Sequence, residues 1–148
     1  MTLESLVEDI WAEKNNRAWD PAVWNFGYCA LEPIEEICNR HKVKYEYDPI
    51  LALYFAKSDK IISPRNPAIL AHELIHWTAP RVKRPTRSYN FEEVVAELGA
   101  AKLLMDLGLA VDTYTAVNYC TKYSRSLTKK KLLEAAGLAN TAVEYLHD

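Results

Sequence analysis

Residues 72–76 read HELIH, two histidines four positions apart with a glutamate directly after the first. On a helix, positions i and i+4 share one face, so both imidazoles can bind one divalent cation. A catalytic zinc needs three protein ligands and an open position for water, whose pKa the metal lowers. The motif predicts metal-dependent hydrolysis, with His72 and His76 as ligands and Glu73 as the general base.

The third ligand is expected from an acidic segment downstream, which contains Glu92, Glu93 and Glu97. Glu93 and Glu97 share a helical face, so one can bind metal while the other hydrogen-bonds a ligand histidine. Glu92 points about a quarter-turn away. Without a metal, Glu93 would be a capping residue answering Asn90, and Glu97 a solvated position or an ion-pair partner. The histidines would then be two hydrogen-bonded side chains on a half-buried helix, which the combined pattern disfavours.

Two predicted helices position these residues. The first begins at Asn66-Pro67, a capping side chain followed by a proline suited to the first helical position. It stops near Ala79, because the following proline disfavours helical geometry there. The second is capped by Ser88 or Asn90 and runs to about Leu107, where a glycine follows.

The loop between these helices is basic and contains Arg81, Lys83, Arg84 and Arg87. It lies close enough to the predicted site to contact an acidic substrate or a phosphate backbone, although a solvated loop is the commoner explanation. Arg81 is the candidate for substrate contact. Tyr89, just before the acidic segment, is the candidate donor to the oxyanion of a tetrahedral intermediate, with packing as the alternative.

The remaining pattern predicts further helices and a small sheet. Apolar residues recur at helical steps over residues 2–17, 31–41, 112–123 and 128–146. Short alternating or apolar runs predict three strands, at residues 43–47, 51–56 and 60–63. Residues 61–63 are the candidate edge strand for holding an extended substrate by main-chain pairing. The expected fold is α+β, with a small sheet beside the HELIH helix and flanking helices.

The length and charge of the chain narrow its class. A chain of 148 residues and 16.9 kDa fits one domain with its own core. Eighteen Lys and Arg against 20 Asp and Glu give a formal charge of −2, so DNA binding would need a local basic patch. No stretch of 18 consecutive apolar residues occurs, which argues against a membrane span.

The cysteines and the first residues indicate a cytoplasmic setting. Cys29, Cys38 and Cys120 form no CxxC pair, and their odd number favours a reducing compartment. We expect them to be buried structural thiols. Residues 1–16 carry four acids and lack the basic and apolar regions of a signal peptide.

Three segments resemble the metallopeptidase domain of ArdC-type antirestriction proteins, a zincin-like family of plasmids and phages. They are LYFAKSDKIISP (53–64), HELIHWTAPRVKR (72–84) and YNFEEVVAELGAA (89–101). The resemblance runs from about residue 51 to the C-terminus and is most specific in HELxHWT and EExVAELGAA. It implies a zincin-like domain with one zinc ion per chain. We therefore expect residues 1–148 to form a single domain, with 49–148 as its family-like core and 1–48 as a helical extension and first strand.

The segment EVVAELGAAKLLM (93–105) also resembles the third-ligand helix of metallopeptidases that act in bacterial stress responses or cleave phage repressors. In that group the ligand is the glutamate six residues before the Gly-Ala-Ala step. The resemblance thus implies Glu93 as the third ligand and Glu97 as the partner of a ligand histidine. ArdC-type proteins also carry an N-terminal domain that binds single-stranded DNA, whereas about fifty unlike residues precede the match here. Ala79-Pro80 also replaces their Gly-His. The resemblance therefore implies the metal site, and it supports DNA binding only weakly.

The expected function is a zinc-dependent metallopeptidase that hydrolyses a protein substrate, encoded by a phage or plasmid to counteract host restriction. One alternative is a metal-containing binding protein that blocks a host nuclease or covers DNA without hydrolysis. Another is a regulatory protease that cleaves a single repressor. A site with two histidines and one glutamate also accepts manganese, cobalt or iron. The substrate and the oligomeric state are not indicated by the sequence.

Overall fold

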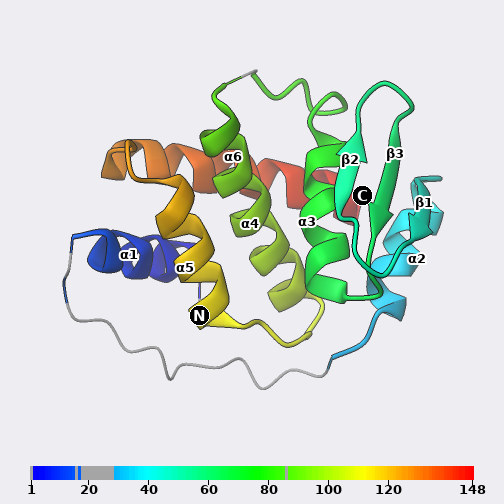
Figure 1. Cartoon of the computed structure of the whole chain (residues 1–148), viewed down its shortest axis with the longest axis horizontal. Helices are drawn as coiled ribbons and strands as arrows, with labels where there is room; N and C mark the ends of the chain where they lie inside the picture. Colours follow the sequence, from blue (N-terminus) through cyan, green and yellow to red (C-terminus); the bar gives the residue numbers. More distant parts are fainter. Residues whose placement is uncertain (1, 16, 18–28, 86) are drawn as a thin grey trace.

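The helix that carries HELIH lies between a small sheet and a long central helix (Figure 1). The computed structural model describes residues 2–15, 17, 29–85 and 87–148, which form six helices and one three-stranded sheet. In chain order the elements are α1 (Leu3–Lys14), α2 (Glu32–Arg40), β1 (Lys44–Tyr47), β2 (Leu53–Phe55), β3 (Lys60–Ser63), α3 (Pro67–Thr78), α4 (Tyr89–Asp106), α5 (Thr113–Tyr123) and α6 (Lys129–His147). The α+β architecture expected from the sequence is confirmed.

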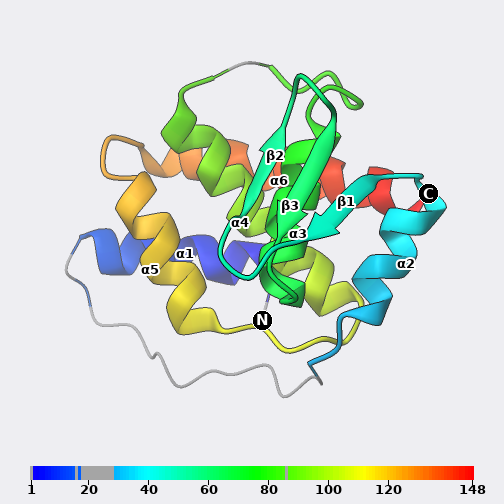
Figure 2. The same ribbon diagram turned by 45° about the vertical axis from the view of Figure 1, so that its right-hand side comes forward.

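The sheet has the order β1-β3-β2, with β1 parallel and β2 antiparallel to β3 (Figure 2). The expectation that residues 61–63 form an edge strand is therefore wrong. Ile61 of β3 pairs with Tyr45 on one side and Tyr54 on the other, and its side chain is fully buried. Strand β3 is the most buried of the three, with both Ile61 and Ser63 buried. The edges of the sheet are β1 and β2.

Capping side chains fix where α3 and α4 begin. The Asn66 side chain caps α3 by accepting hydrogen bonds from the backbone N–H of Ala68 (2.9 Å) and of Ile69 (3.2 Å). The Ser88 hydroxyl caps α4 by accepting from the N–H of Phe91 at 3.2 Å. Of the two caps predicted for this helix, Ser88 is the one used.

Helix α4 is the centre of the core and packs against α3, α5 and α6. Helix α6 crosses behind both α3 and α4 in Figures 1 and 2. A β-carbon placed on Gly99 of α4 would lie 2.9 Å from the Ile75 side chain of α3, closer than such atoms normally approach. Glycine at this position therefore permits the close contact of α3 and α4.

The remaining expectations are partly met. Cys38 and Cys120 are buried, and burial raises the pKa of the Cys38 thiol to about 12. Cys29 is exposed, against expectation; it lies outside the hydrophobic core, against which the next two residues, Ala30 and Leu31, pack. Across the part of the chain that the structure describes, no helix is both long and apolar enough to cross a membrane. Residues 18–28 lie outside the described residues.

Candidate metal centre

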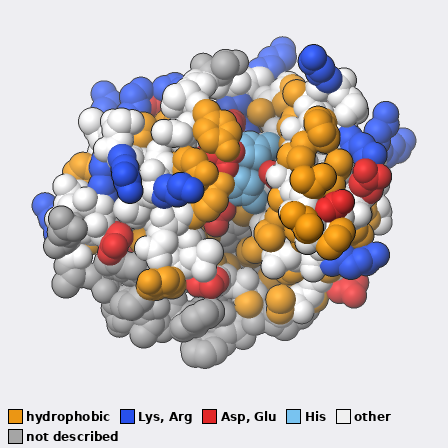
Figure 3. Space-filling view, in the orientation of Figure 1, with side chains coloured by type: hydrophobic (Ala, Val, Ile, Leu, Met, Phe, Trp, Pro, Cys, Tyr) orange, Lys and Arg blue, Asp and Glu red, His pale blue; other side chains and the backbone are white. Residues whose placement is uncertain are grey.

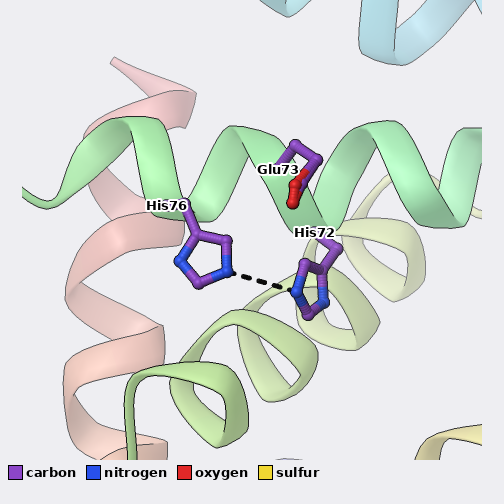
Figure 4. Close-up of side chains that lie close together, drawn as sticks. All are labelled: His72, Glu73 and His76. Carbon is purple, nitrogen blue, oxygen red and sulfur yellow. Dashed lines mark hydrogen bonds between the residues drawn. The ribbon is translucent and has the colours of Figure 1, made fainter. Parts of the chain in front are cut away.

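The two histidines of α3 present their rings toward α4 (Figure 4). His72 and His76 lie one turn apart, and their Nε2 atoms are 3.2 Å from each other. Glu73 lies on the same helix, and one potential ligand atom from each of these three residues falls within 4.8 Å of the others. The HELIH spacing therefore brings two imidazoles and a carboxylate together, as the helical pattern predicts.

Glu93 of α4 lies opposite both histidines. Its Oε1 is 3.0 Å from Nε2 of His76, and its Oε2 is 3.2 Å from Nε2 of His72. Ligand atoms about 2.0–2.1 Å from a tetrahedral zinc ion are about 3.3 Å apart. The Nε2 atoms of the two histidines are 3.2 Å apart, and each lies 3.0–3.2 Å from one Glu93 oxygen, Oε1 for His76 and Oε2 for His72, so the three side chains approach one another at close to that spacing. The donor set of two imidazoles and one carboxylate thus fits a single zinc ion in both chemistry and size.

The other two glutamates face the opposite nitrogens of the same rings. Glu97 Oε2 is 2.8 Å from Nδ1 of His72, a direct hydrogen bond. Glu92 Oε2 is 3.9 Å from Nδ1 of His76. Glu93 is therefore placed among the Nε2 atoms, whereas Glu97 and Glu92 lie behind the rings, where a carboxylate orients an imidazole and makes it a stronger ligand.

The carboxylate of Glu73 is buried next to the histidines, and its Oε2 has no hydrogen-bond partner among the described residues. Burial raises the pKa of this carboxyl group above its usual value, and the nearby histidines oppose the shift. A buried carboxylate oxygen without a partner is costly in a folded protein. It is the kind of group that a general base needs, since it is free to accept a proton.

The mutual contacts also shift the pKa values of the proposed donors. Burial alone would lower the pKa of His72, but the hydrogen bonds that its ring donates to the Glu93 and Glu97 carboxylates outweigh it and raise that pKa to about 10. Burial likewise opposes ionisation of Glu93, yet hydrogen bonds with His72, His76 and Tyr119 hold its pKa well below the usual range. The site therefore favours an anionic Glu93 beside positive charge.

A further group at this site, Tyr119, was missed by sequence reasoning. It projects from α5, donates its hydroxyl hydrogen to Glu93 Oε2, and places its ring edge-on to His72 with the centroids 5.4 Å apart. Burial and the Glu93 hydrogen bond raise the pKa of this hydroxyl, so it stays protonated. No local motif marks Tyr119. It lies three residues after Ala116, a spacing shared by many residues on the packed face of a helix.

Arg84 is not the exposed substrate contact that the basic loop suggests. Its side chain is only 2% exposed. It donates from Nε to Glu92 Oε1 at 2.7 Å, from Nη1 to Thr78 Oγ1 at 3.1 Å, and from Nη2 to the carbonyl of Ile75 at 2.9 Å. Arg84 thus joins the end of α3 to the start of α4, and the carbonyl groups that end a helix explain why a guanidinium is buried there.

The structure also places the other two candidate substrate contacts. Arg81 pairs with Asp59, and its guanidinium lies 3.5 Å from the centroid of the Trp77 ring, so it links the β2–β3 turn to the end of α3. Tyr89 is 68% exposed and packs edge-on against Tyr123, with the ring centroids 6.0 Å apart. Tyr89 borders the cleft above the site, and Arg81 is not part of its lining.

The histidines and glutamates lie at the base of a cleft of about 1110 Å³. Its walls come from β2, the loop after α3, the start of α4 and one face of α5; those from β2 include Leu53 and Tyr54, and those from α5 include Thr115 and Tyr119. Figure 3 shows histidine side chains at the bottom of this hollow, with hydrophobic side chains on both sides. The site is open to a molecule larger than water.

The protein belongs to the zincin-like metallopeptidase family, whose family model matches residues 32–137. The solved structures similar to it include the antirestriction protein ArdC of plasmid R388. The metal-free form of ArdC is 26% identical with a TM-score of 0.60, and the similarity covers 82% of this chain and 52% of ArdC. The Mn(II)-bound form is 25% identical with a TM-score of 0.59 and coverages of 83% and 54%. The chain thus spans about half the length of ArdC, and a search of curated proteins gives no match.

Proposed function

We propose that the protein is a zinc-dependent peptidase whose metal ligands are His72, His76 and Glu93. The observation that carries the proposal is the set of three distances of 3.0–3.2 Å among the two Nε2 atoms and the Glu93 oxygens. Membership of a metallopeptidase family supports it. When bound, zinc supplies a Lewis acid that polarises a peptide carbonyl and lowers the pKa of water.

Glu73 is the proposed general base. Its buried carboxylate lies beside the proposed ligands with one oxygen unpartnered, so it can take a proton from the attacking water. The same carboxyl group then gives that proton to the leaving amine nitrogen, and the peptide bond breaks. Its raised pKa brings its proton affinity closer to what this shuttle requires near neutral pH.

The cleft and the sheet suggest how a protein substrate binds. Strand β2 is an edge of the sheet, and its Leu53 and Tyr54 line the cleft. We place an extended segment of the substrate along β2, where main-chain pairing holds it without demanding a particular sequence. This assignment replaces the pairing along residues 61–63, because β3 already has a partner on each side.

The similarity to ArdC supports a role in antirestriction, the activity named for that protein. The proposed substrate is accordingly a host protein that acts against foreign DNA. In a second candidate function the protein acts by binding alone, and the metal only stabilises the fold. The unpartnered Glu73 oxygen favours catalysis, because a purely structural metal site has no use for it.

Two measurements test the proposal. Elemental mass spectrometry of the wild type should find about one zinc ion per chain, lost in His76→Ala and Glu93→Ala but largely kept in Glu97→Ala. Glu73→Gln should keep the metal and lose peptide cleavage, measured on a denatured protein mixture and on restriction-complex subunits. If Glu73→Gln still protects incoming DNA from restriction, the binding function replaces the peptidase. A wild type that takes up no zinc would rule out both the site and the mechanism.

A further inference from the structure

The two oxygens of Glu93 have different surroundings. Oε1 has the Nε2 atom of His76 at 3.0 Å. Oε2 has the Nε2 atom of His72 at 3.2 Å and also accepts the hydrogen bond from the Tyr119 hydroxyl. A carboxylate oxygen has two lone pairs, so the tyrosine occupies part of the capacity of Oε2 and leaves Oε1 unaffected.

This asymmetry matters for the number of ligands around a metal. A carboxylate that binds through both oxygens takes two positions, whereas one that binds through a single oxygen takes one. A catalytic zinc with three protein ligands keeps its fourth position open for water only when each ligand takes one position. A group that engages one Glu93 oxygen therefore decides whether the water position stays open.

We propose that Tyr119 is a positioning residue that holds Glu93 by Oε2, so that Glu93 binds the metal through Oε1 alone. This inference rests on the proposed function, since it requires Glu93 to be a metal ligand. It assigns α5 a part in the site, although α5 supplies none of the proposed ligands.

The surroundings of Tyr119 suit such a role. Its ring is held between His72, at 5.4 Å, and Tyr123 on the next turn of α5, at 4.8 Å between centroids. Helix α5 itself is fixed by its Asp112 cap and by packing against α4 and α1. Because the ring has little freedom, its hydroxyl stays directed at Glu93. Tyr89, in contrast, is mostly exposed at the rim of the cleft.

The test compares Tyr119→Phe with the wild type, using Co²⁺ as the probe and the full chain. Phenylalanine keeps the ring and removes only the hydroxyl. Tyr123→Phe is the matched control, since it makes the same change one turn away on α5. Co²⁺ affinity is measured by competition with a chelator, coordination by visible absorption, and folding by the melting temperature of the metal-free variants.

We expect Tyr119→Phe to bind Co²⁺ roughly 10–100-fold more weakly, the usual effect of losing a group that orients a ligand. Its visible absorption spectrum should also change, because cobalt bound by both Glu93 oxygens has a carboxylate oxygen in the position that water takes when Glu93 binds through Oε1 alone. Tyr123→Phe should match the wild type in both, and the melting temperatures of all three metal-free proteins should agree within a few degrees.

Each other result overturns the inference in a recognisable way. Equal affinity and equal spectra for Tyr119→Phe and the wild type would show that the hydroxyl does not position Glu93. Unchanged Co²⁺ binding with slower peptide cleavage would assign the hydroxyl to the substrate instead. If the wild type binds neither Co²⁺ nor zinc, the proposed function fails and this inference fails with it.

Discussion

His72 and His76 lie one turn apart on α3, yet the regions behind their rings differ. His72 Nδ1 has a direct hydrogen bond with Glu97 at 2.8 Å, and the Tyr119 ring borders the same imidazole. His76 Nδ1 lies 3.9 Å from Glu92, whose carboxylate is already paired with the buried Arg84. A carboxylate shared with a guanidinium attracts an imidazole less than one that serves the ring alone. Two histidines equivalent in the motif are therefore oriented with different strength.

The largest expected effect is a loss of zinc binding that is similar for the two histidines. His72→Ala and His76→Ala each remove one of three ligands, so each should weaken zinc binding more than about 100-fold, beyond what an outer partner contributes. Chelator competition on the two purified variants measures both losses. Near-normal zinc binding by either variant would show that this histidine is not a ligand.

A second prediction concerns the pH dependence of zinc affinity, which reflects the carboxylates around His72. In the metal-free protein, Glu93 and Glu97 raise the pKa of His72 to about 10, so His72 carries a proton at pH 7 that zinc must displace. Zinc affinity should therefore rise with pH, by up to about tenfold per unit while one proton is displaced, and level off near pH 10. Isothermal titration calorimetry in two buffers of different ionisation enthalpy counts the proton, and Glu97→Gln should reduce the number released at pH 8.

The raised pKa of His72 also makes the stability of the metal-free protein depend on pH. The folded-state pKa of His72 lies above its ordinary value of 6.5, so its contribution to the stability of the metal-free protein is complete below about pH 6.5. That contribution disappears as the pH rises through about 10. Melting of the metal-free wild type should show this loss between about pH 6.5 and 10, and His72→Ala should lack it.

The smallest expected effects compare the carboxylates behind the rings. Glu97→Gln should weaken zinc binding roughly 10–100-fold, because the direct hydrogen bond to His72 loses its charge. Glu92→Gln should weaken it less than about tenfold, since Glu92 is farther from its histidine and is neutralised by Arg84. Both affinities come from the same chelator assay, and equal losses would contradict the difference between the two regions.

The sequence predicted the parts of this structure that depend on local spacing. The caps at Asn66 and Ser88 and the shared face of His72 and His76 follow from rules that act over one or two helical turns. The order of the three strands does not, because short runs of similar composition say nothing about which one lies in the middle. The edge strand was assigned wrongly for this reason.

The site shows the same limit. Residue spacing alone left Glu93 and Glu97 as equal candidates for the third ligand, although the family resemblance implied Glu93. In the structure the packing of α4 on α3 brings Glu93 close to the Nε2 atoms and Glu97 behind His72. Tyr119 and Arg84 act through contacts with other elements, so no nearby residue marks them. Its charge alone suggested that Arg84 is exposed. It is buried instead, because three hydrogen-bond acceptors surround its guanidinium group.

The close approach of α3 and α4 at Gly99 also bears on which ions the site can select. Gly99 lies on the same helix as Glu93, and a larger residue there would press on Ile75 and move α4 away from the histidines. The proposed donor atoms lie 3.0–3.2 Å from one another, which suits a small ion. Calcium is larger: its ligands lie about 2.3–2.6 Å from the ion, and it binds more of them. A single hydrogen in place of a side chain, more than a full turn of helix from Glu93, thus permits the short distance between α3 and α4 on which this spacing of the proposed donors depends.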